Sequence, residues 1–258
     1  MRVPQSIRRV LDPLVGWIRV PVLKGVNRGQ WWTIVSAGGY ATGRRARVEM
    51  ELLRDLLEPG DTCWDVGAHH GAMTLLASAR VGTAGRVHAF EPSGRNRHVL
   101  AAHVRWNRCA NVTVHPCALG AADGEARLGG DGTSSAYRLG RGSEVVTVRA
   151  GTSLVAAGES APPTFAKIDV EGAGGEAVAG LVAALAPQAR LFIEIHTLEE
   201  DARCVPVLRQ NCFSLHESRG LLAARTGDPS VPHWCLFAVG PGWPHQARDF
   251  ARVEAAGF

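Results

Sequence analysis

The sequence predicts an α/β protein built on a doubly wound, mostly parallel sheet, and three observations lead to this prediction. Short apolar runs alternate with helical segments along most of the 258-residue chain, as in parallel sheets with crossover helices. Residues 61–92 read as strand, glycine turn, helix, strand and acid. Asp65, Glu91, Asp169 and Glu194 fall at or near the ends of predicted strands. Ligands of open α/β sheets bind at that edge, so we expect these acids to surround a ligand site.

The predicted elements follow in chain order. Apolar positions recur at helical spacing over residues 44–58, and Pro59-Gly60 ends that helix. Residues 120–163 form a glycine-rich excursion with β-like pieces at 125–128 and 145–149, which we expect to shape the substrate mouth rather than form a second domain. The other strands are predicted at 63–66, 87–90, 112–115, 165–168, 191–195, 213–217 and 234–239, and the other helices at 72–79, 95–107, 176–185 and 198–210, with Pro206 expected to kink or split the last.

The composition is that of an ordinary globular protein, with 46% apolar and 20% charged residues. No apolar run approaches the ~20 residues that span a bilayer. Asp12-Pro13 and Arg19 interrupt the stretch after Arg8 and Arg9, so no signal peptide is expected. Six cysteines without a Cys-x-x-Cys pair predict buried thiols rather than disulfides or a zinc site. These features predict a cytoplasmic protein.

Positive charge is concentrated in a predicted N-terminal extension, residues 1–43, which precedes a single domain of residues 44–258. Residues 1–50 hold nine Arg or Lys residues and two acids, a balance of +7, whereas the rest holds 19 against 22, a balance of −3. We favour solvated arginines over an anionic partner or membrane surface, and expect no nucleic acid partner. Asp12-Pro13 predicts a short helix. Trp31-Trp32 predicts a packing strap, with an aromatic wall for a substrate as the alternative.

The first βαβ unit suits a nucleoside-like ligand. Gly67 and Gly71 let the backbone turn sharply and approach a ligand closely. Glu91 is placed to accept hydrogen bonds from two ribose hydroxyls. The spacing Gly-x-x-x-Gly differs from the Gly-x-Gly-x-x-Gly that binds a dinucleotide pyrophosphate. These residues therefore predict a nucleoside without that diphosphate.

Five motifs occur in one order: Asp65-Val-Gly-Ala-His-His-Gly, Phe90-Glu-Pro, Gly132-Thr-Ser-Ser, Lys167-Ile-Asp-Val-Glu-Gly and Glu194-Ile-His. Together they resemble the FkbM family of S-adenosylmethionine-dependent methyltransferases over roughly residues 45 to 200, and the ordered set is far more specific than any one motif. The resemblance implies a Rossmann-like class I methyltransferase fold with an antiparallel last strand. It also implies methyl transfer from S-adenosylmethionine to a hydroxyl of a small molecule or sugar.

The resemblance places the cofactor at the first βαβ unit, with Gly67 to Gly71 along its methionine part and Glu91 at its ribose. The family usually has Asn where this chain has His69, so a solvated pair of turn histidines, His69 and His70, is a close alternative to a functional role. The implied cofactor-binding residues are Asp65, Gly67, Ala68, His69, Gly71, Thr74, Glu91 and Pro92.

Methyl transfer to a hydroxyl needs an in-line approach and a base for the hydroxyl proton. Asp169, Glu171 and His196 are the candidate bases. Asp169 and His196 follow strands that are adjacent in the fold that the chain resembles, so we expect them to lie together. Asp169 and Glu171, with Glu194, are alternatively candidate ligands of Mg²⁺. If the strand that ends at Asp169 continues, Asp169 and Glu171 point to the same side. A structural ion pair between Lys167 and Asp169 remains the simplest alternative.

Two acids that the family usually has are absent, because Gly174 and Val155 stand at those positions. Their absence leaves a non-catalytic S-adenosylmethionine-binding protein open as an alternative function. A nucleotide-dependent oxidoreductase on a similar sheet is the other alternative, and the glycine spacing and the Lys167 motif argue against it.

Overall fold

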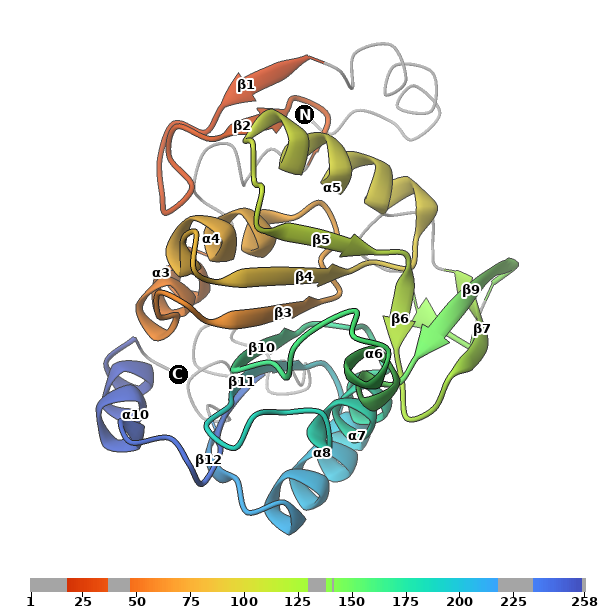
Figure 1. The fold of residues 1–258 in the computed structure, drawn as a ribbon. Helices are drawn as coiled ribbons and strands as arrows, with labels where there is room; N and C mark the ends of the chain where they lie inside the picture. The colour runs from red at the N-terminus through yellow and green to blue at the C-terminus, as the bar shows by residue number, and fades with distance from the viewer. Residues whose placement is uncertain (1–17, 37–46, 130–137, 141, 218–233, 257–258) are drawn as a thin grey trace.

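The computed structural model describes residues 18–36, 47–129, 138–140, 142–217 and 234–256. A seven-stranded sheet in the order β12-β13-β11-β10-β3-β4-β5 forms its centre (Figure 1). β13 is antiparallel to both neighbours, and the other pairs are parallel. The predicted class I methyltransferase fold is therefore confirmed. The strands are Thr62–Val66 (β3), Arg86–Phe90 (β4), Val112–His115 (β5), Phe165–Ile168 (β10), Arg190–Ile195 (β11), Ser214–Glu217 (β12) and Trp234–Val239 (β13).

Helices cover both faces of this sheet (Figure 1). Because side chains alternate along a strand, Cys63, Phe165 and Phe192 pack against α3, α4 and α10. Trp64 and Ala166 pack on the other face, against α6, α7 and α8. Full burial of a Phe or Leu in such layers stabilises the fold by roughly 1.5–3 kcal/mol. The helices are α3 (Arg47–Leu56), α4 (Ala72–Val81), α5 (Gly94–Trp106), α6 (Gly151–Ala156), α7 (Gly174–Val182), α8 (Leu198–Gln210) and α10 (Gln246–Ala255).

Each predicted helix and strand of the central sheet has a counterpart, with ends that differ by a few residues. The periodicity did not predict α6, α10 or the short strand β6 (Cys117–Leu119). The predicted split at Pro206 is wrong, because α8 is a single helix with Pro206 inside it. Cys204 and Leu208, both fully buried against the sheet, hold the helix on either side of the proline.

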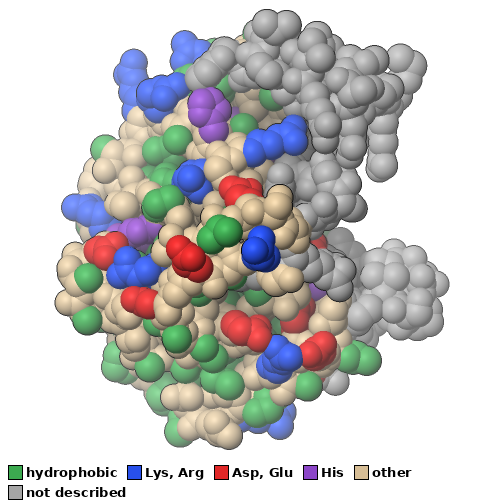
Figure 2. All heavy atoms as spheres, turned by 90° about the vertical axis from the view of Figure 1, so that its right-hand side faces the viewer, with side chains coloured by type: hydrophobic (Ala, Val, Ile, Leu, Met, Phe, Trp, Pro, Cys, Tyr) green, Lys and Arg blue, Asp and Glu red, His purple; other side chains and the backbone are tan. Residues whose placement is uncertain are grey.

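The glycine-rich excursion forms a second, four-stranded sheet in the order β6-β9-β7-β8. It adds β7 (Gly124–Gly129), β8 (Arg138–Leu139) and β9 (Glu144–Arg149) to β6, and lies on the side to which the parallel strands point (Figure 1). The Gly132-Thr-Ser-Ser motif lies outside the described residues. Figure 2 looks onto this side, where the described acids and arginines are interspersed. The described part of this face therefore carries no single-sign stripe of the kind that binds nucleic acid.

The described part of the N-terminal region is a hairpin of β1 (Arg19–Pro21) and β2 (Trp31–Thr33). Trp32 is 1% exposed and stacks on His103 of α5, with ring centroids 3.9 Å apart. The Asn27 amide donates to the Ala72 carbonyl of α4 at 2.8 Å. Residues 18–36 thus pack as a strap on α4 and α5. The helix expected at Asp12-Pro13 lies outside the described residues, and the boundary at residue 44 stays a prediction.

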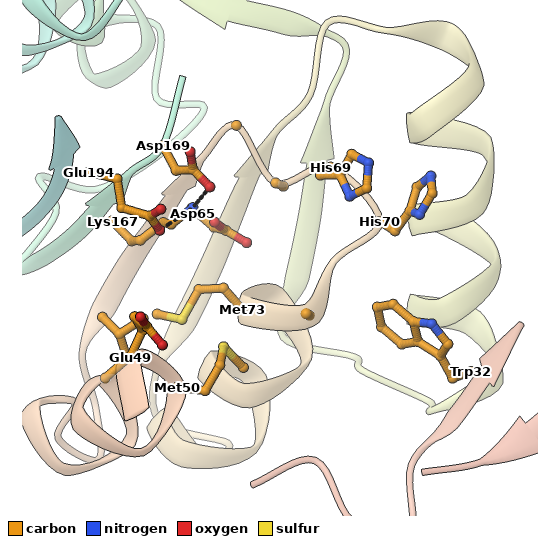
Figure 3. A pocket seen from close by; sticks show the side chains of 14 residues that line it. Trp32, Glu49, Met50, Asp65, His69, His70, Met73, Lys167, Asp169 and Glu194 are labelled. Atoms are coloured by element: carbon orange, nitrogen blue, oxygen red, sulfur yellow. Dashed lines mark hydrogen bonds and ion pairs between the residues drawn. The ribbon is translucent and has the colours of Figure 1, made fainter. Parts of the chain in front are cut away.

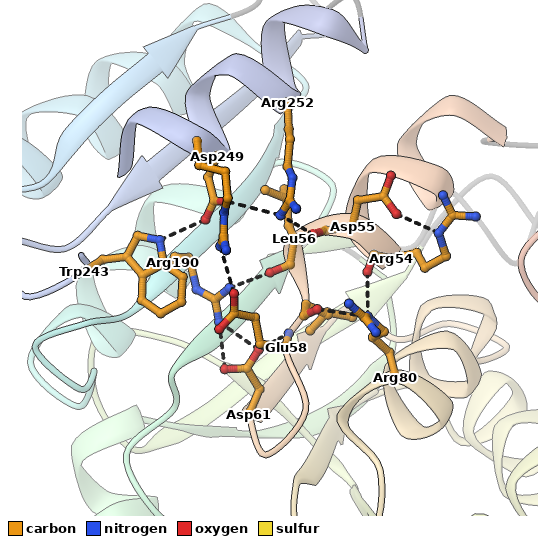
Figure 4. Close-up of polar contacts among 12 residues, drawn as sticks. Arg54, Asp55, Leu56, Glu58, Asp61, Arg80, Arg190, Trp243, Asp249 and Arg252 are labelled. Carbon is orange, nitrogen blue, oxygen red and sulfur yellow. Dashed lines mark hydrogen bonds and ion pairs between the residues drawn. The ribbon is translucent and has the colours of Figure 1, made fainter. Parts of the chain in front are cut away.

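A buried ion pair lies at the amino edge of the central sheet (Figure 4). Arg190 begins β11, and its Nη2 lies 2.7 Å from both carboxylate oxygens of Asp61. The Thr164 hydroxyl and the Glu58 N–H also donate to Asp61, each at 2.7 Å. The guanidinium lies over the Trp243 ring, 4.0 Å from its centroid. We call these five residues the amino-edge clasp.

All six cysteines are free thiols. Cys63, Cys117, Cys204 and Cys235 are buried as predicted. Cys109 is only partly buried, and the prediction is wrong for Cys212, which is exposed in a left-handed turn after α8 with φ of 62°. Across the described residues, every helix is too short or too polar to cross a membrane.

Candidate active site

The carboxyl edge of the central sheet gathers charged side chains on one face. Asp65 of β3 lies opposite Lys167 of β10, and Glu194 lies on the next strand, β11. By alternation all three point to the face that α3 and α4 cover. A pocket opens there, as Figure 3 shows. Its lining residues are Trp32, Glu49, Met50, Leu53, Asp65, Gly67, Ala68, His69, His70, Ala72, Met73, Lys167, Asp169 and Glu194.

The turn after β3 requires glycine at two positions. Gly67 has a φ of 79°, and a Cβ there would collide with the Asp169 carbonyl oxygen. Gly71 has a φ of 89°, and a Cβ there would collide with the Leu100 side chain. Side chains rarely adopt such left-handed angles. The turn therefore presents its backbone at Gly67 and Ala68 to the pocket.

His69 and His70 differ in their surroundings. His69 has a left-handed φ of 51°, which asparagine, the usual residue of the family, adopts more readily than most residues. His70 Nδ1 lies 2.6 Å from the Ser36 hydroxyl of the strap. Burial lowers the pKa of His70 to about 2, so its ring is neutral at physiological pH. The solvated-pair interpretation is wrong for His70, because the strap buries it.

Glu91 follows β4 and lies beside the same turn. Its carboxylate accepts hydrogen bonds from the His69 N–H at 2.7 Å and the Ser93 N–H at 2.9 Å. Burial raises its pKa to about 7, against the opposing effect of these two bonds. Pro92 is half-buried, and its carbonyl accepts a bond from Arg97 at 2.9 Å. Glu91 thus follows β4 as predicted and is fixed by backbone N–H groups. It is absent from the pocket lining, and its ribose-binding role stays a prediction.

Asp65 is fully buried and only partly satisfied. The Thr74 hydroxyl donates to Oδ2 at 2.5 Å, whereas Oδ1 has no hydrogen-bond partner among the described residues. Burial raises the pKa of Asp65, although nearby Lys167 opposes this shift. Thr74 is itself fully buried and is absent from the lining. Any effect of Thr74 on a ligand would therefore pass through Asp65.

Lys167 links three carboxylates at this edge. Its Nζ lies 2.8 Å from Asp169 Oδ2 and 3.7 Å from Glu194 Oε1. Burial favours the neutral amine, but Asp169, Glu194 and Asp65 outweigh it and raise the pKa of Lys167. The predicted ion pair with Asp169 is therefore confirmed, and Lys167 carries its charge inside the pocket wall.

Asp169 also contacts His196, which follows β11. His196 Nε2 lies 3.1 Å from Asp169 Oδ1. Burial raises the pKa of Asp169, but Lys167 and His196 outweigh it and hold that pKa well below its usual range. Burial lowers the pKa of His196, but Asp169 outweighs it and raises the pKa above 6.5. The two candidate catalytic residues are thus in contact, and of the two only Asp169 lines the pocket beside Gly67.

Glu171 departs from its expected position. β10 ends at Ile168, and Glu171 lies in a turn, so it does not share a strand face with Asp169 and that expectation is wrong. Its negative charge still acts on His196. The set that can hold a cation among the described residues is Asp169, Glu194 and His196, whose ligand atoms lie within 4.8 Å of one another. The Lys167 ammonium already pairs with both carboxylates and would compete with a metal ion for them.

At Gly174, where the family usually has an acid, the carboxylate of Glu200 lies nearby. A Cβ at Gly174 would lie 3.5 Å from Oε1 of Glu200. That oxygen accepts the Gly174 N–H at 3.2 Å, and Oε2 accepts the His196 N–H at 2.7 Å. Glu200 therefore joins the start of α7 to the residue after β11. Val155, at the other position, packs in the apolar layer on α6.

The prediction missed the part of the wall that α3 supplies, Glu49, Met50 and Leu53. Helical periodicity identified this helix but carries no signal for which sheet edge it approaches. Trp32 was a recognised candidate for a wall, and it both lines the pocket and packs the strap.

Comparisons with known proteins identify the family. The model of the methyltransferase FkbM domain matches residues 65–229. The hexuronic acid methyltransferase AglP of Haloferax volcanii is 28% identical over 210 residues, which cover 76% of this chain and 84% of AglP. The solved structure of methyltransferase FkbM from Methylobacillus flagellatus is 17% identical with a TM-score of 0.52, and the match covers 78% of this chain and 53% of that one. A candidate rRNA methylase of Clostridium thermocellum, 11% identical with a TM-score of 0.52 over 76% of this chain and 94% of its own, shares the fold.

The two solved structures support the class I fold, and the family model matches most of the chain. This protein therefore belongs to the FkbM family of methyltransferases.

Proposed function

We propose that this protein transfers a methyl group from S-adenosylmethionine to a hydroxyl oxygen of a sugar or another small molecule. One observation carries the proposal: Asp169, which binds His196, lines the same pocket as the Gly67–Gly71 turn. The turn that is proposed to bind the cofactor and Asp169, the partner of the proposed base, thereby line one pocket. AglP, named for methylating a hexuronic acid, supports a sugar as the acceptor class.

The residues present fit this cofactor. Asp65 Oδ1, buried and without a partner in the described part of the chain, suits an ammonium donor. Ionised Glu91 suits two ribose hydroxyls, and the glycine turn leaves room for close backbone approach. Once bound, S-adenosylmethionine supplies an electrophilic methyl group on a sulfonium sulfur.

His196 serves as the base in this proposal. Asp169 accepts a hydrogen bond from Nε2–H, which makes Nδ1 the basic nitrogen. Nδ1 takes the proton of the acceptor hydroxyl, and Asp169 stabilises the imidazolium that forms. Only neutral His196 can act, so turnover rises as pH rises through its raised pKa.

Two alternatives to this role have different signatures. A metal ion on Asp169, Glu194 and His196 would make turnover depend on a divalent cation. A non-catalytic S-adenosylmethionine-binding protein would bind S-adenosylhomocysteine without transferring a methyl group. Membership of a methyltransferase family disfavours the oxidoreductase alternative.

The test uses S-adenosylmethionine with an isotopically labelled methyl group and a panel of neutral sugars, sugar acids and polyols. We expect acceptor-dependent release of S-adenosylhomocysteine and a label that survives alkaline hydrolysis, as a methyl ether does. A label released by alkali, as from a methyl ester, would contradict transfer to a hydroxyl. Tight binding of S-adenosylhomocysteine with no transfer to any acceptor would favour the non-catalytic alternative.

A further inference from the structure

The pocket holds more negative charge than its own lysine neutralises. Its lining includes four carboxyl groups, those of Glu49, Asp65, Asp169 and Glu194, and one lysine, Lys167. That ammonium is already shared by Asp169 and Glu194. S-adenosylmethionine carries a net charge of about +1 at neutral pH, from its sulfonium, ammonium and carboxylate groups. Cofactor binding would therefore leave the described lining acidic.

Glu49 is the carboxylate that the proposed reaction leaves unused. It lies in the first turn of α3, where an acid is favoured by the helix dipole, but its side chain lines the pocket. Hydrogen bonds and ion pairs among the described residues do not include it. Glu51, two residues on, instead pairs with Arg47 outside the pocket at 3.0 Å. Glu49 is thus available to a ligand.

The position of Glu49 assigns it to the acceptor rather than to the nucleoside. Figure 3 shows Glu49 on the side of Lys167, Asp169 and Glu194, across the pocket from His69. The His69 N–H binds Glu91, the proposed ribose acid, so the nucleoside lies on that far side. Asp169, the proposed partner of the base His196, lies on the Glu49 side.

We propose that the acceptor is an uncharged sugar or polyol, and that Glu49 determines this specificity. This inference rests on the proposed methyl transfer to a hydroxyl. Hydroxyl groups of the acceptor donate hydrogen bonds to Glu49, whereas an acidic acceptor would place a second carboxylate against Glu49 and Glu194. Two carboxylates in contact repel each other strongly in a partly buried site. The chain thereby differs in acceptor charge from AglP, to which it is 28% identical.

The experiment compares two acceptors that differ only at C6, a neutral methyl hexoside and the corresponding methyl hexuronide. For the unaltered protein we expect kcat/KM for the neutral member to be higher by about tenfold or more. Glu49→Gln should narrow this ratio, and Glu49→Lys should favour the hexuronide. Glu51→Lys is the matched control, because it makes the same charge change on α3 outside the pocket, and it should leave the ratio unchanged.

S-adenosylhomocysteine affinity, measured by calorimetry, distinguishes a wrong role for Glu49 from a wrong proposal of methyl transfer. The inference expects this affinity to stay the same in the Glu49 variants. A preference of the unaltered protein for the hexuronide, or a ratio that Glu49→Lys does not change, would overturn the inference and leave methyl transfer intact. A loss of cofactor affinity in Glu49→Gln would assign Glu49 to the cofactor and overturn it too. Cofactor binding with no transfer to either sugar would overturn the inference, and no transfer to any member of the acceptor panel would overturn the proposed function as well.

Discussion

The amino and carboxyl edges of the central sheet each bury a basic side chain beside acids, but they satisfy those acids differently. In the amino-edge clasp each oxygen of Asp61 accepts two hydrogen bonds, and Arg190 stacks on Trp243. At the carboxyl edge Lys167 is likewise buried and contacts Asp169 and Glu194. Asp65 Oδ1 nevertheless has no partner there among the described residues.

The difference separates a structural charge cluster from a functional one. A buried polar atom without a partner costs about 1–3 kcal/mol. The Asp61 carboxylate avoids that cost, although Nε of Arg190 in the clasp has no partner among the described residues. At the pocket the same cost leaves acceptor atoms in place for a ligand. We therefore expect substitutions at the amino edge to change stability, and substitutions at the carboxyl edge to change binding and turnover.

The largest effect should come from breaking the clasp. Asp61→Ala leaves the Arg190 guanidinium buried without its carboxylate, so the free energy of unfolding should fall by about 3–5 kcal/mol. Urea unfolding measures this free energy. Asp55→Ala is the control, because Asp55 pairs with Arg54 at 2.7 Å on the surface, and it should cost about 1 kcal/mol or less. Equal losses in the two variants would remove the distinction between the clasp and an ordinary ion pair.

At the carboxyl edge His196→Ala should lower kcat about 100-fold and leave S-adenosylhomocysteine affinity nearly intact. The activity of the unaltered protein should increase with pH through the raised pKa of His196, since only the neutral ring accepts a proton. Initial rates from pH 5.5 to 9 measure kcat and its pH dependence, and calorimetry measures S-adenosylhomocysteine affinity. Activity that vanishes with a chelator but survives His196→Ala would assign the site to a metal ion instead.

A smaller, pH-dependent effect should come from Glu91, whose pKa is raised to about 7 by burial. Ribose hydroxyls donate to the ionised carboxylate, so S-adenosylhomocysteine affinity should weaken below pH 7, by up to about tenfold per pH unit. The contribution of Glu91 to the free energy of unfolding should change with pH in the opposite direction to the cofactor affinity. The folded protein keeps a proton that the unfolded chain loses, so this contribution is present below pH 4.5 and is lost as pH rises through 7. Calorimetric titrations between pH 5.5 and 8.5 test this. A cofactor affinity that does not change with pH, or that matches in Glu91→Gln, would remove Glu91 from the ribose site.

The smallest effect should come from reductant and chelator, because all six cysteines are free and neither edge of the sheet needs a disulfide. Burial raises the pKa of Cys204 to about 12, so this thiol stays protonated. Melting curves with and without each reagent should overlay. A large fall in melting temperature with either reagent would reveal a metal or disulfide contribution to the fold.

The sequence predicted best where local pattern and topology agree. Parallel strands end at one edge, so Asp169 and His196, which follow adjacent strands, were expected together and lie 3.1 Å apart. The glycines at 67 and 71 were expected because few other residues fit that turn. Lys167 was expected only as a partner of Asp169, yet it also reaches Glu194.

The rest depended on contacts between distant segments. Arg190 and Asp61 are 129 residues apart, and no periodicity marks them as partners. Glu49 was one charge among several on a helix whose approach to the pocket is set by packing of Leu52 and Leu53. Thr74 matched the cofactor turn by position, but the burial that directs it to Asp65 is a tertiary property. The hairpin of residues 19–33 was missed because strands this short have too few positions to show alternation.

The central claim is that S-adenosylmethionine satisfies the carboxylates of the carboxyl edge, whereas the Asp61 carboxylate of the amino edge is satisfied without a ligand. The most direct test is thermal unfolding of the protein with S-adenosylhomocysteine, NAD or NADP added separately, since a ligand that binds only the folded state stabilises it. At a concentration of 100 Kd, S-adenosylhomocysteine should add about 2.7 kcal/mol, NAD and NADP should add nothing, and Glu91→Ala should greatly reduce the gain. Stabilisation by NAD alone, or no stabilisation by S-adenosylhomocysteine, would contradict the claim.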